Sequence, residues 1–334
     1  MSLPRWHAVE LGAAQRHEVS ALFAQVFGLP MSDALWRWKY DAGRGVATGT
    51  RDEQGHLLAH YGGTARVLMV NGVAVNAVQL GDVMVAEQAR GVLSRRGPFA
   101  TAATAFLERH VGVVDGFALG FGFPNQRHTR LGEKLGLYRA LGNVQELSWA
   151  CEDTPATSFF GKAWDTSGLD WSDSRTDEWL DRLWHALRNE AGSFVLPQRD
   201  AQWWRHRFAN HPDGPYRCWW VRGRVSRRVW GAVALRPGRQ AGADWEILDL
   251  LGPMKHLNPL LLAARSLAAR GLAGRLTGWF SEALANHVRS LDAGSGALVQ
   301  MACPYCVTQR RASDLPGAVM AQPWWLTGGD TDFR

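Results

Sequence analysis

Three arginines and two glycines lie close together at one predicted strand-to-helix junction. They are Arg90, Gly91, Arg95, Arg96 and Gly97. Pro98 follows at the predicted helix start, where its fixed φ suits the first helical position. A helix N-terminus has free N–H groups and a partial positive charge, so it binds anions, and guanidinium groups add charge around it. The residues predict a diphosphate site, with a solvated basic turn as the alternative.

The elements around this stretch alternate between strand and helix patterns. The apolar run Val83–Val85 precedes it, and residues 101–111 have apolar side chains at helical spacing. Asn71-Gly72 joins two β-rich runs, a strong hairpin signal. Residues 1–150 therefore predict a helix, antiparallel strands, a central strand, the basic loop, a helix, a strand and a second short helix.

Two motifs recur at one spacing. Asp33 and Asp200 begin similar tryptophan-rich segments, and Asp82 and Asp249 lie in similar apolar runs; both pairs are 167 positions apart. Two matches in register indicate a duplicated fold. The second copy passes from strand to helix after Asp249 without an arginine-glycine loop.

The duplication predicts two domains. Residues 1–150 form the first, and residues 176–334 form a degenerate second copy. Residues 151–175 lose periodicity and gain Thr, Ser, Asp and Gly, which predicts a linker.

Composition narrows the class of protein. The 334 residues are 46% hydrophobic, enough for a core, and the net charge is +6 without a dense lysine or arginine run, which makes nucleic acid an unlikely partner. No apolar run is long enough to span a membrane. Four cysteines make no disulfide framework and favour the cytoplasm, and the isolated pair Cys303 and Cys306 predicts no metal site.

The order of these motifs resembles the GNAT acyltransferase superfamily. The resemblance rests on the strand and loop of residues 81–91, the amphipathic helix after the loop, the "GFPN" strand end at residues 122–125, and the "RLGEKLGL" helix at residues 130–137. It covers residues 10–150 and continues in weaker form to the end. It implies an α+β fold with two tandem GNAT-like domains, each a mixed, mostly antiparallel sheet flanked by helices.

The resemblance also implies an activity. In this superfamily the loop holds the pyrophosphate of coenzyme A, and two strands splay apart so that pantetheine pairs with exposed backbone. The chain is then expected to be an N-acyltransferase, with acetyl-CoA or another acyl-CoA as co-substrate and a small-molecule or peptide amine as acceptor. The residues expected to bind the co-substrate are Val83, Met84, Val85, Arg90, Gly91, Arg95, Arg96, Gly97, Pro98, Phe99 and Asn125.

Two departures from the family pattern affect the predicted site. The loop sequence Ser94–Phe99 lacks the usual glycine spacing, which a longer loop including Arg90 would reconcile. Where many relatives have a tyrosine that protonates the leaving thiolate, this chain has Gly132, and Tyr138 is the candidate replacement. Asn125 is also compatible with an ordinary Pro-Asn turn.

Asp82 is the candidate catalytic carboxylate. Buried carboxylates need partners, so an amine-binding role and a structural ion pair are both open, and the repeat at Asp249 favours the structural role. The carboxy-terminal residues from Trp324 to Asp332 are expected to be a frayed tail, with an acidic amine-binding tail as the alternative. Two other functions stay open: a non-catalytic ligand-binding or regulatory module, and an aminoacyl-tRNA-dependent ligase.

Overall fold

The computed structural model describes residues 5–92, 95–151, 164–308 and 317–331. The chain divides into two compact units. Unit 1 consists of residues 1–67, 75–142 and 303–320; unit 2 consists of residues 68–74, 143–302 and 321–334. The chain therefore passes between the units several times. The predicted boundary at residue 150 lies within β6 (Tyr138–Ala150), whose first residues belong to unit 1 and whose last residues belong to unit 2.

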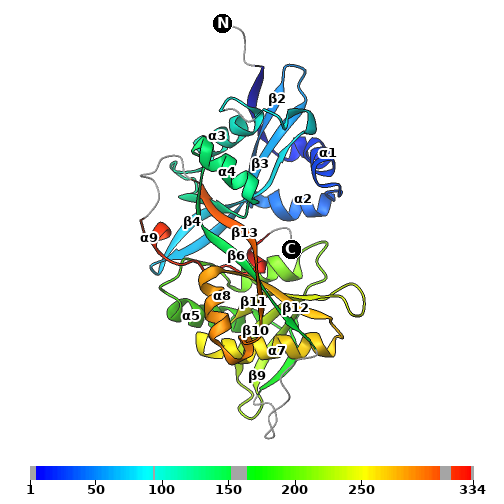
Figure 1. The fold of residues 1–334 in the computed structure, drawn as a ribbon, viewed down its shortest axis with the longest axis vertical. Coiled ribbons are helices and arrows are strands. Elements are labelled where there is room, and N and C mark those ends of the chain that lie inside the picture. Colours follow the sequence, from blue (N-terminus) through cyan, green and yellow to red (C-terminus); the bar gives the residue numbers. More distant parts are fainter. Residues whose placement is uncertain (1–4, 93–94, 152–163, 309–316, 332–334) are drawn as a thin grey trace. The chain divides into compact units, whose positions relative to one another are not determined.

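Unit 1 is a mixed sheet with helices on both faces (Figure 1). Its strands lie in the order β1-β2-β3-β4-β5-β13-β6. The helices are α1 (Arg16–Phe27), α2 (Asp33–Tyr40), α3 (Pro98–His110) and α4 (Gln126–Leu135). The strands other than β6 are β1 (Trp6–Leu11), β2 (Gly45–Asp52), β3 (Leu57–Val70), β4 (Val73–Val85), β5 (Leu119–Gly122) and β13 (Leu298–Thr308).

Each face of the unit 1 sheet has its own apolar core. Phe99 and Phe106 of α3 pack with Ala59 and Tyr61 of β3 on one face. The residues of α1 and α2 pack on the other face, where Trp36 of the tryptophan-rich segment is buried. In Figure 1, α3 and α4 accordingly lie on one side of the strands and α1 and α2 on the other.

The predicted hairpin is confirmed. Asn71 and Gly72 connect β3 to β4, and both have φ in the left-handed region, 51° and 77°. Two consecutive residues with positive φ give the turn whose twist matches antiparallel strands. The predicted helix after the basic loop is also present, and it begins at Pro98.

Unit 2 contains the remaining strands of the sheet, in the order β6-β12-β11-β10-β9-β7. The strands besides β6 are β7 (Trp164–Gly168), β9 (Arg217–Gly223), β10 (Val229–Arg236), β11 (Trp245–Leu251) and β12 (Arg275–Ser281), and the short β8 (Leu196–Pro197) pairs with residues 68–69 of β3. The helices are α5 (Arg175–Glu190), α6 (Ala201–Trp204), α7 (Leu257–Arg270) and α8 (Glu282–Ser290), and α9 (Gly317–Ala321) lies at the change from unit 1 to unit 2.

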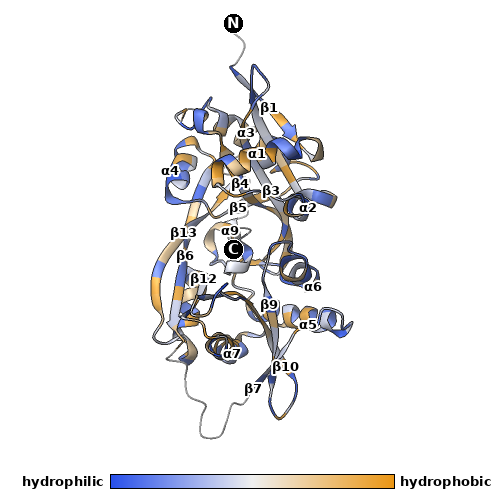
Figure 2. Ribbon diagram, turned by 90° about the vertical axis from the view of Figure 1, so that its right-hand side faces the viewer, coloured by the Kyte–Doolittle hydropathy of each residue, from blue (hydrophilic) through white to orange (hydrophobic). Residues whose placement is uncertain are grey.

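Helices α5 and α7 cover the unit 2 core. Leu180, Leu183 and Leu187 lie on the buried side of α5, at the helical spacing visible in the sequence. Both helices show apolar and polar stretches in Figure 2, as expected for helices with one buried side. None of the helices in the described ranges is long and apolar enough to cross a membrane.

Part of the predicted linker is structured. Residues 152–163 lie outside the described residues, but Trp164–Gly168 is the edge strand β7, paired with β9, and α5 begins at Arg175. The low periodicity of residues 151–175 therefore did not reveal a short edge strand.

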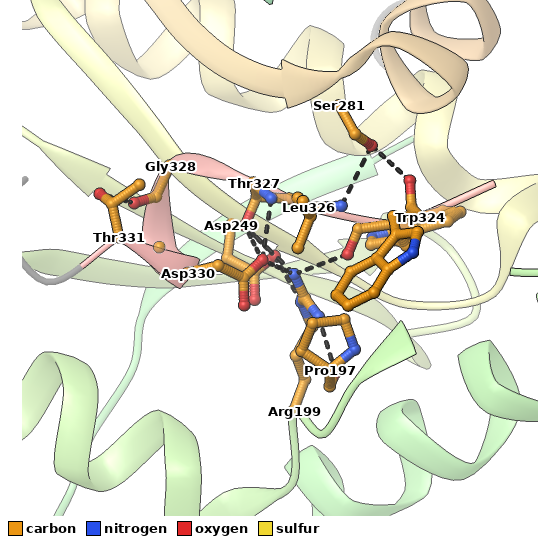
Figure 3. A network of polar contacts seen from close by, with 12 residues as sticks. Pro197, Arg199, Asp249, Ser281, Trp324, Leu326, Thr327, Gly328, Asp330 and Thr331 are labelled. Carbon is orange, nitrogen blue, oxygen red and sulfur yellow. Dashed lines mark hydrogen bonds and ion pairs between the residues drawn. The ribbon is translucent and has the colours of Figure 1, made fainter. Parts of the chain in front are cut away.

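Asp249 lies at the centre of a buried polar network in unit 2 (Figure 3). Arg199 donates from Nε to Asp249 Oδ1 at 3.2 Å and from a terminal nitrogen to Asp330 Oδ2. All three side chains are buried, and Thr327 Oγ1 donates to Asp249 Oδ1 at 3.4 Å. Two carboxylates thus share one guanidinium group.

We expect Asp249 to make the stability of unit 2 depend on pH. Burial, with a smaller contribution from Asp330, raises the pKa of Asp249 although Arg199 opposes it. A carboxyl whose pKa is higher in the folded than in the unfolded chain adds stability at pH below about 4, and this contribution is lost as pH rises through the folded-state pKa. As pH rises from about 4, Asp249→Asn should therefore lose less stability than the unaltered chain, as measured by urea unfolding over a series of pH values. Asp213→Asn, at an exposed position, is the control, and identical pH dependence of Asp249→Asn and the unaltered chain would contradict the expectation.

Candidate active site

Helix α3 begins at the predicted anion site. Gly97 is the N-cap residue, Pro98 is the first helical residue, and no described side chain caps this end. The first turn of an uncapped helix has N–H groups without intrahelical acceptors. Thr50 of β2 donates from Oγ1 to Pro98 O at 2.9 Å, which fixes the helix start against the sheet. The first amides of α3 thus lack intrahelical acceptors, while Gly97, Pro98, Phe99 and Ala100 are buried and the exposed part of this region is the loop before them.

The arginines of the loop are exposed. Arg90 donates from Nε to Val85 O at 3.2 Å, so the loop is attached to the last residue of β4. Arg95 and Arg96 are exposed, and the carbonyl of Arg96 accepts from Trp6 Nε1 at 2.5 Å. A Cβ added at Gly91 would meet no atom within 4 Å, so the backbone there is open to approach. Residues 93–94 of the loop lie outside the described residues.

Strand β4 continues beyond its pairing with β5. The parallel ladder runs from Ala77 opposite Leu119 to Leu80 opposite Gly122, and β4 then extends to Val85. The predicted pantetheine-pairing residues Val83, Met84 and Val85 all lie in this extension. The extension leads directly towards the arginine loop, since Glu87–Ala89 form only a short turn between them.

A β-bulge at Asp82 reverses the alternation of side chains along β4. Asp82 has φ = 50°, which is unusual in a strand and tolerated best by Gly, Asn and Asp. Val78 packs with the α3 core before the bulge, and Val83 and Val85 pack with it after the bulge. Met84 packs with α1 and α2 instead. Without the extra residue, Asp82 would face α3 rather than α2.

The bulge brings Asp82 to two residues of α2. Lys39 donates from Nζ to Asp82 Oδ1 at 2.6 Å, and Tyr40 donates from its hydroxyl to Oδ2 at 2.7 Å. The side chains of Lys39 and Asp82 are 4% and 5% exposed, so this is a buried ion pair. His60 Nδ1 lies 2.7 Å from Asp82 O. Lys39 is thus the ion-pair partner of Asp82, which the sequence alone did not identify.

The cation determines the ionisation of this cluster. Burial alone would raise the pKa of Asp82, but the Lys39 ammonium and the hydrogen bonds from Lys39 and Tyr40 outweigh it and lower the pKa. Burial also lowers the pKa of His60, which is therefore neutral. Asp82 is an ionised carboxylate with its charge already neutralised, and a carboxylate with a lowered pKa is a weak base. Lys39 and Tyr40 were visible in the sequence only as part of a tryptophan-rich packing segment.

Tyr138 lies over Gly132. A Cβ added at Gly132 would be 2.0 Å from a ring carbon of Tyr138, so the tyrosine ring occupies the space that a side chain at position 132 would need. Phe99 contacts the same ring at a centroid distance of 6.5 Å in a T-shaped arrangement. The chain therefore has an aromatic ring above position 132 although the residue itself is glycine.

The surroundings of Tyr138 keep its hydroxyl protonated. Burial raises the pKa of Tyr138 well above its usual value; the nearby Tyr61 hydroxyl partly opposes this and Cys306 adds to it. Tyr61 is fully buried, and its hydroxyl lies beside that of Tyr138. The Tyr138 phenol is neutral at pH 7, as an ordinary tyrosine is, and its raised pKa makes it a weaker acid than an exposed tyrosine.

Asn125 caps helix α4. Its Oδ1 accepts from His128 N at 2.9 Å, and its carbonyl accepts from Thr129 Oγ1 at 3.0 Å. Asn125 is therefore the N-cap of α4, a role that the sequence did not identify, and its predicted role towards pantetheine stays a prediction. Cys303 and Cys306 are buried and form no disulfide, and no cluster of His, Cys, Asp or Glu in the described ranges could hold a metal ion.

We expect Gly132→Ala to destabilise unit 1 by about 1 to 3 kcal/mol, because the methyl group must displace the Tyr138 ring. In a Tyr138→Ala background the same change should cost nothing or stabilise α4 by up to about 1 kcal/mol, since alanine is the better helix former. Thermal unfolding of the four proteins in this double-mutant cycle measures the difference. Equal costs in both backgrounds would contradict the contact.

Comparison of the sequence with protein-family models and with curated proteins finds no match. Solved structures do match. A conserved protein of Enterococcus faecalis V583, described as a probable N-acyltransferase, aligns with a TM-score of 0.68 at 15% identity over 90% of this chain and 72% of its own. A GCN5-related N-acetyltransferase from Anabaena variabilis aligns with a TM-score of 0.68 at 12% identity over 91% and 72%.

Saccharomyces cerevisiae N-myristoyltransferase with bound myristoyl-CoA aligns more distantly, with a TM-score of 0.57 at 11% identity over 93% of this chain and 84% of its own. These alignments extend over both units. The α+β fold predicted from the sequence, a mixed sheet flanked by helices, is confirmed. The chain has the GNAT fold, shared with GCN5-related N-acetyltransferases and N-myristoyltransferases.

Proposed function

We propose that unit 1 binds an acyl-CoA and transfers its acyl group to the amine of a small molecule or peptide. The observation that carries this proposal is the uncapped start of α3 at Gly97 and Pro98, with exposed arginines in the loop before it. An uncapped helix start beside guanidinium groups suits a diphosphate. The acyltransferases of the same fold, one of them with bound myristoyl-CoA, support the choice of acyl-CoA.

The residues present fit the parts of an acyl-CoA. Arg90, Arg95, Arg96 and the first amides of α3 would hold the diphosphate. The backbone of Val83–Val85, beyond the β5 ladder, would pair with the pantetheine arm. Gly91 would leave room for the ligand to approach the loop. Phe99, in the first turn of α3, would line the path towards Tyr138.

Acyl transfer breaks the C–S bond of the thioester, forms a C–N bond to the amine and leaves a thiolate that takes up a proton. We assign Tyr138 as the proton donor, because its ring stands over position 132, where many members of the superfamily have the tyrosine that protonates the thiolate. Asp82 is a weak base while it is paired with Lys39, so the amine has to lose its proton to solvent or to another group. Asp82 then serves to hold Lys39 and Tyr40 at the bulge.

Replacing both Arg95 and Arg96 by alanine should weaken coenzyme A binding at least tenfold, since two charges beside the diphosphate are lost. Isothermal titration calorimetry with coenzyme A measures the affinity. Arg224→Ala/Arg228→Ala, which removes the same charge from exposed positions of unit 2, should bind as the unaltered chain does. Unchanged affinity in Arg95→Ala/Arg96→Ala would exclude the loop as the diphosphate site.

Tyr138→Phe should lower kcat about a hundredfold or more and leave the affinity for acyl-CoA unchanged, because only the proton donor is lost. Thiol release from acyl-CoA in the presence of an amine panel measures the rate, and Tyr216→Phe in unit 2 is the control. Full activity of Tyr138→Phe would remove this residue from the mechanism. No thiol release by the unaltered chain with any amine would favour a non-catalytic acyl-CoA-binding protein.

A further inference from the structure

The carboxy-terminal segment Trp324–Thr331 is buried in unit 2. Trp324, Leu326 and Asp330 are each at most 1% exposed. The expected frayed tail is therefore wrong for these residues, while Asp332 lies outside the described residues. A segment this deeply buried needs partners for its backbone groups.

The segment adds to the end of β12. Thr327 forms an antiparallel bridge with Phe280, Ser281 N donates to Leu326 O at 3.0 Å, and Leu326 N donates to Ser281 Oγ at 3.2 Å. The parallel ladder of β11 and β12 ends before this point, with Ile247 opposite Gly278. The segment thus pairs with the part of β12 that β11 no longer pairs with.

The segment also contacts the extension of β11. A Cβ added at Gly329 would be 2.8 Å from Leu248 O, and one at Gly328 would be 3.3 Å from Ile247 O. The sequence Gly328-Gly329 therefore permits a backbone approach that larger residues would prevent. Trp325 N donates to Val195 O at 2.9 Å, and Val195 N donates to Pro323 O at 2.9 Å. The segment is held by backbone bonds from two sides.

The buried ion pair fixes the position of the segment along the strands. Arg199 reaches Asp330 and Thr327, and Thr327 N donates to Asp330 Oδ2 at 2.9 Å (Figure 3). A shift of one residue would separate Asp330 from Arg199 and leave buried charges without partners, at a cost of several kcal/mol. Buried polar groups of this kind set register rather than add net stability.

The strands that hold the segment correspond to the candidate acyl-CoA site of unit 1. Asp249 of β11 repeats Asp82 of β4, and both strands form a short parallel ladder with the next strand, β12 or β5, before extending past it. Both also have a bulge at the aspartate, since β11 places Leu248 as an extra residue opposite β10. In unit 1 this part of β4 is the proposed pantetheine site, so the comparison rests on the proposed function.

We propose that Trp324–Thr331 is a built-in ligand of unit 2, bound between the diverging ends of β11 and β12 where unit 1 would bind the extended arm of its co-substrate. The binding site accepts an extended polypeptide with a Gly-Gly turn and a carboxylate for Arg199. It is separable from the core, so a peptide with the same sequence can replace the segment. Unit 2 is thereby closed to acyl-CoA by the chain's own end.

Hydrogen exchange on the full chain tests whether the segment Trp324–Thr331 opens independently of the unit 2 core. The amides of Trp325 and Leu326 should exchange faster than those of β11 between Ile247 and Leu250. Asp330→Asn should speed exchange of the segment at least tenfold and that of β11 less than threefold, because Arg199 keeps Asp249 as a partner. Asp213→Asn, at an exposed position, should change neither. Equal exchange of the segment and β11 in all three proteins would make the segment part of the core and overturn the proposal.

Peptide binding tests the site itself. A fluorescent peptide with the sequence of residues 317–334 should bind full-length Asp330→Asn at least tenfold more tightly than the unaltered chain, whose own segment competes. The same peptide with alanine in place of Asp330 should bind at least tenfold more weakly. No binding of the first peptide, although exchange shows the segment of Asp330→Asn to be open, would overturn the proposal. Neither the exchange nor the peptide measurement uses acyl-CoA. Both results are therefore independent of those obtained with Arg95→Ala/Arg96→Ala and Tyr138→Phe.

Discussion

An aspartate buried beside a bulge in the central strand is paired with a buried cation in each unit. In unit 1 the pair is Asp82 with Lys39, and in unit 2 it is Asp249 with Arg199, which also serves Asp330. A carboxylate buried in an apolar core without such a partner is strongly disfavoured, so the segment that supplies the cation has to remain against the sheet. The pair therefore fixes the bulge, and the bulge fixes the direction of the strand beyond it. In unit 1 that strand end leads to the arginine loop.

The two units build different features on this common plan. In unit 1 a short turn after β4 is followed by residues 90–97, and only then does α3 begin. In unit 2 the corresponding turn, Met254–His256, leads directly into α7, so there is no room for an arginine loop. The extension of β11 instead contacts Gly328 and Gly329. Unit 1 thus has the elements of an anion site, and in unit 2 the ends of β11 and β12 are covered by residues 324–331.

Local signals were sufficient for the elements that frame the candidate site. Gly97-Pro98 predicted the start of α3, and Asn71-Gly72 predicted the hairpin, because each pattern fixes the backbone through its own residues. The repeat at 167 positions predicted that Asp82 and Asp249 would have matching surroundings, and both are paired with a cation. The α+β class followed from the resemblance of these elements, in their order, to the GNAT superfamily.

Local signals could not predict which side of the sheet the Asp82 side chain points to, or that the segment around Asp330 is buried. Simple alternation along β4 directs Asp82 towards α3, and only its positive φ turns it towards Lys39, 43 positions earlier. Asp330 meets Arg199 across 131 positions, and no local pattern in a Gly- and Asp-containing tail signals burial. Short edge strands such as Trp164–Gly168 carry too few residues to show a period.

Buried charge in this protein specifies position more than it adds stability. Arg199 serves two carboxylates, and Asp249 Oδ2 has no hydrogen-bond partner among the described residues, so the network is costly by comparison with apolar side chains of the same volume. Because of this network, Arg199 can pair with Asp330 only when residues 324–331 lie in one register along the neighbouring strands. In unit 1 the buried Tyr61 hydroxyl lies beside that of Tyr138 and partly opposes the effect of burial on the pKa of Tyr138. A buried polar group in unit 1 therefore also acts on one particular neighbour, the proposed proton donor.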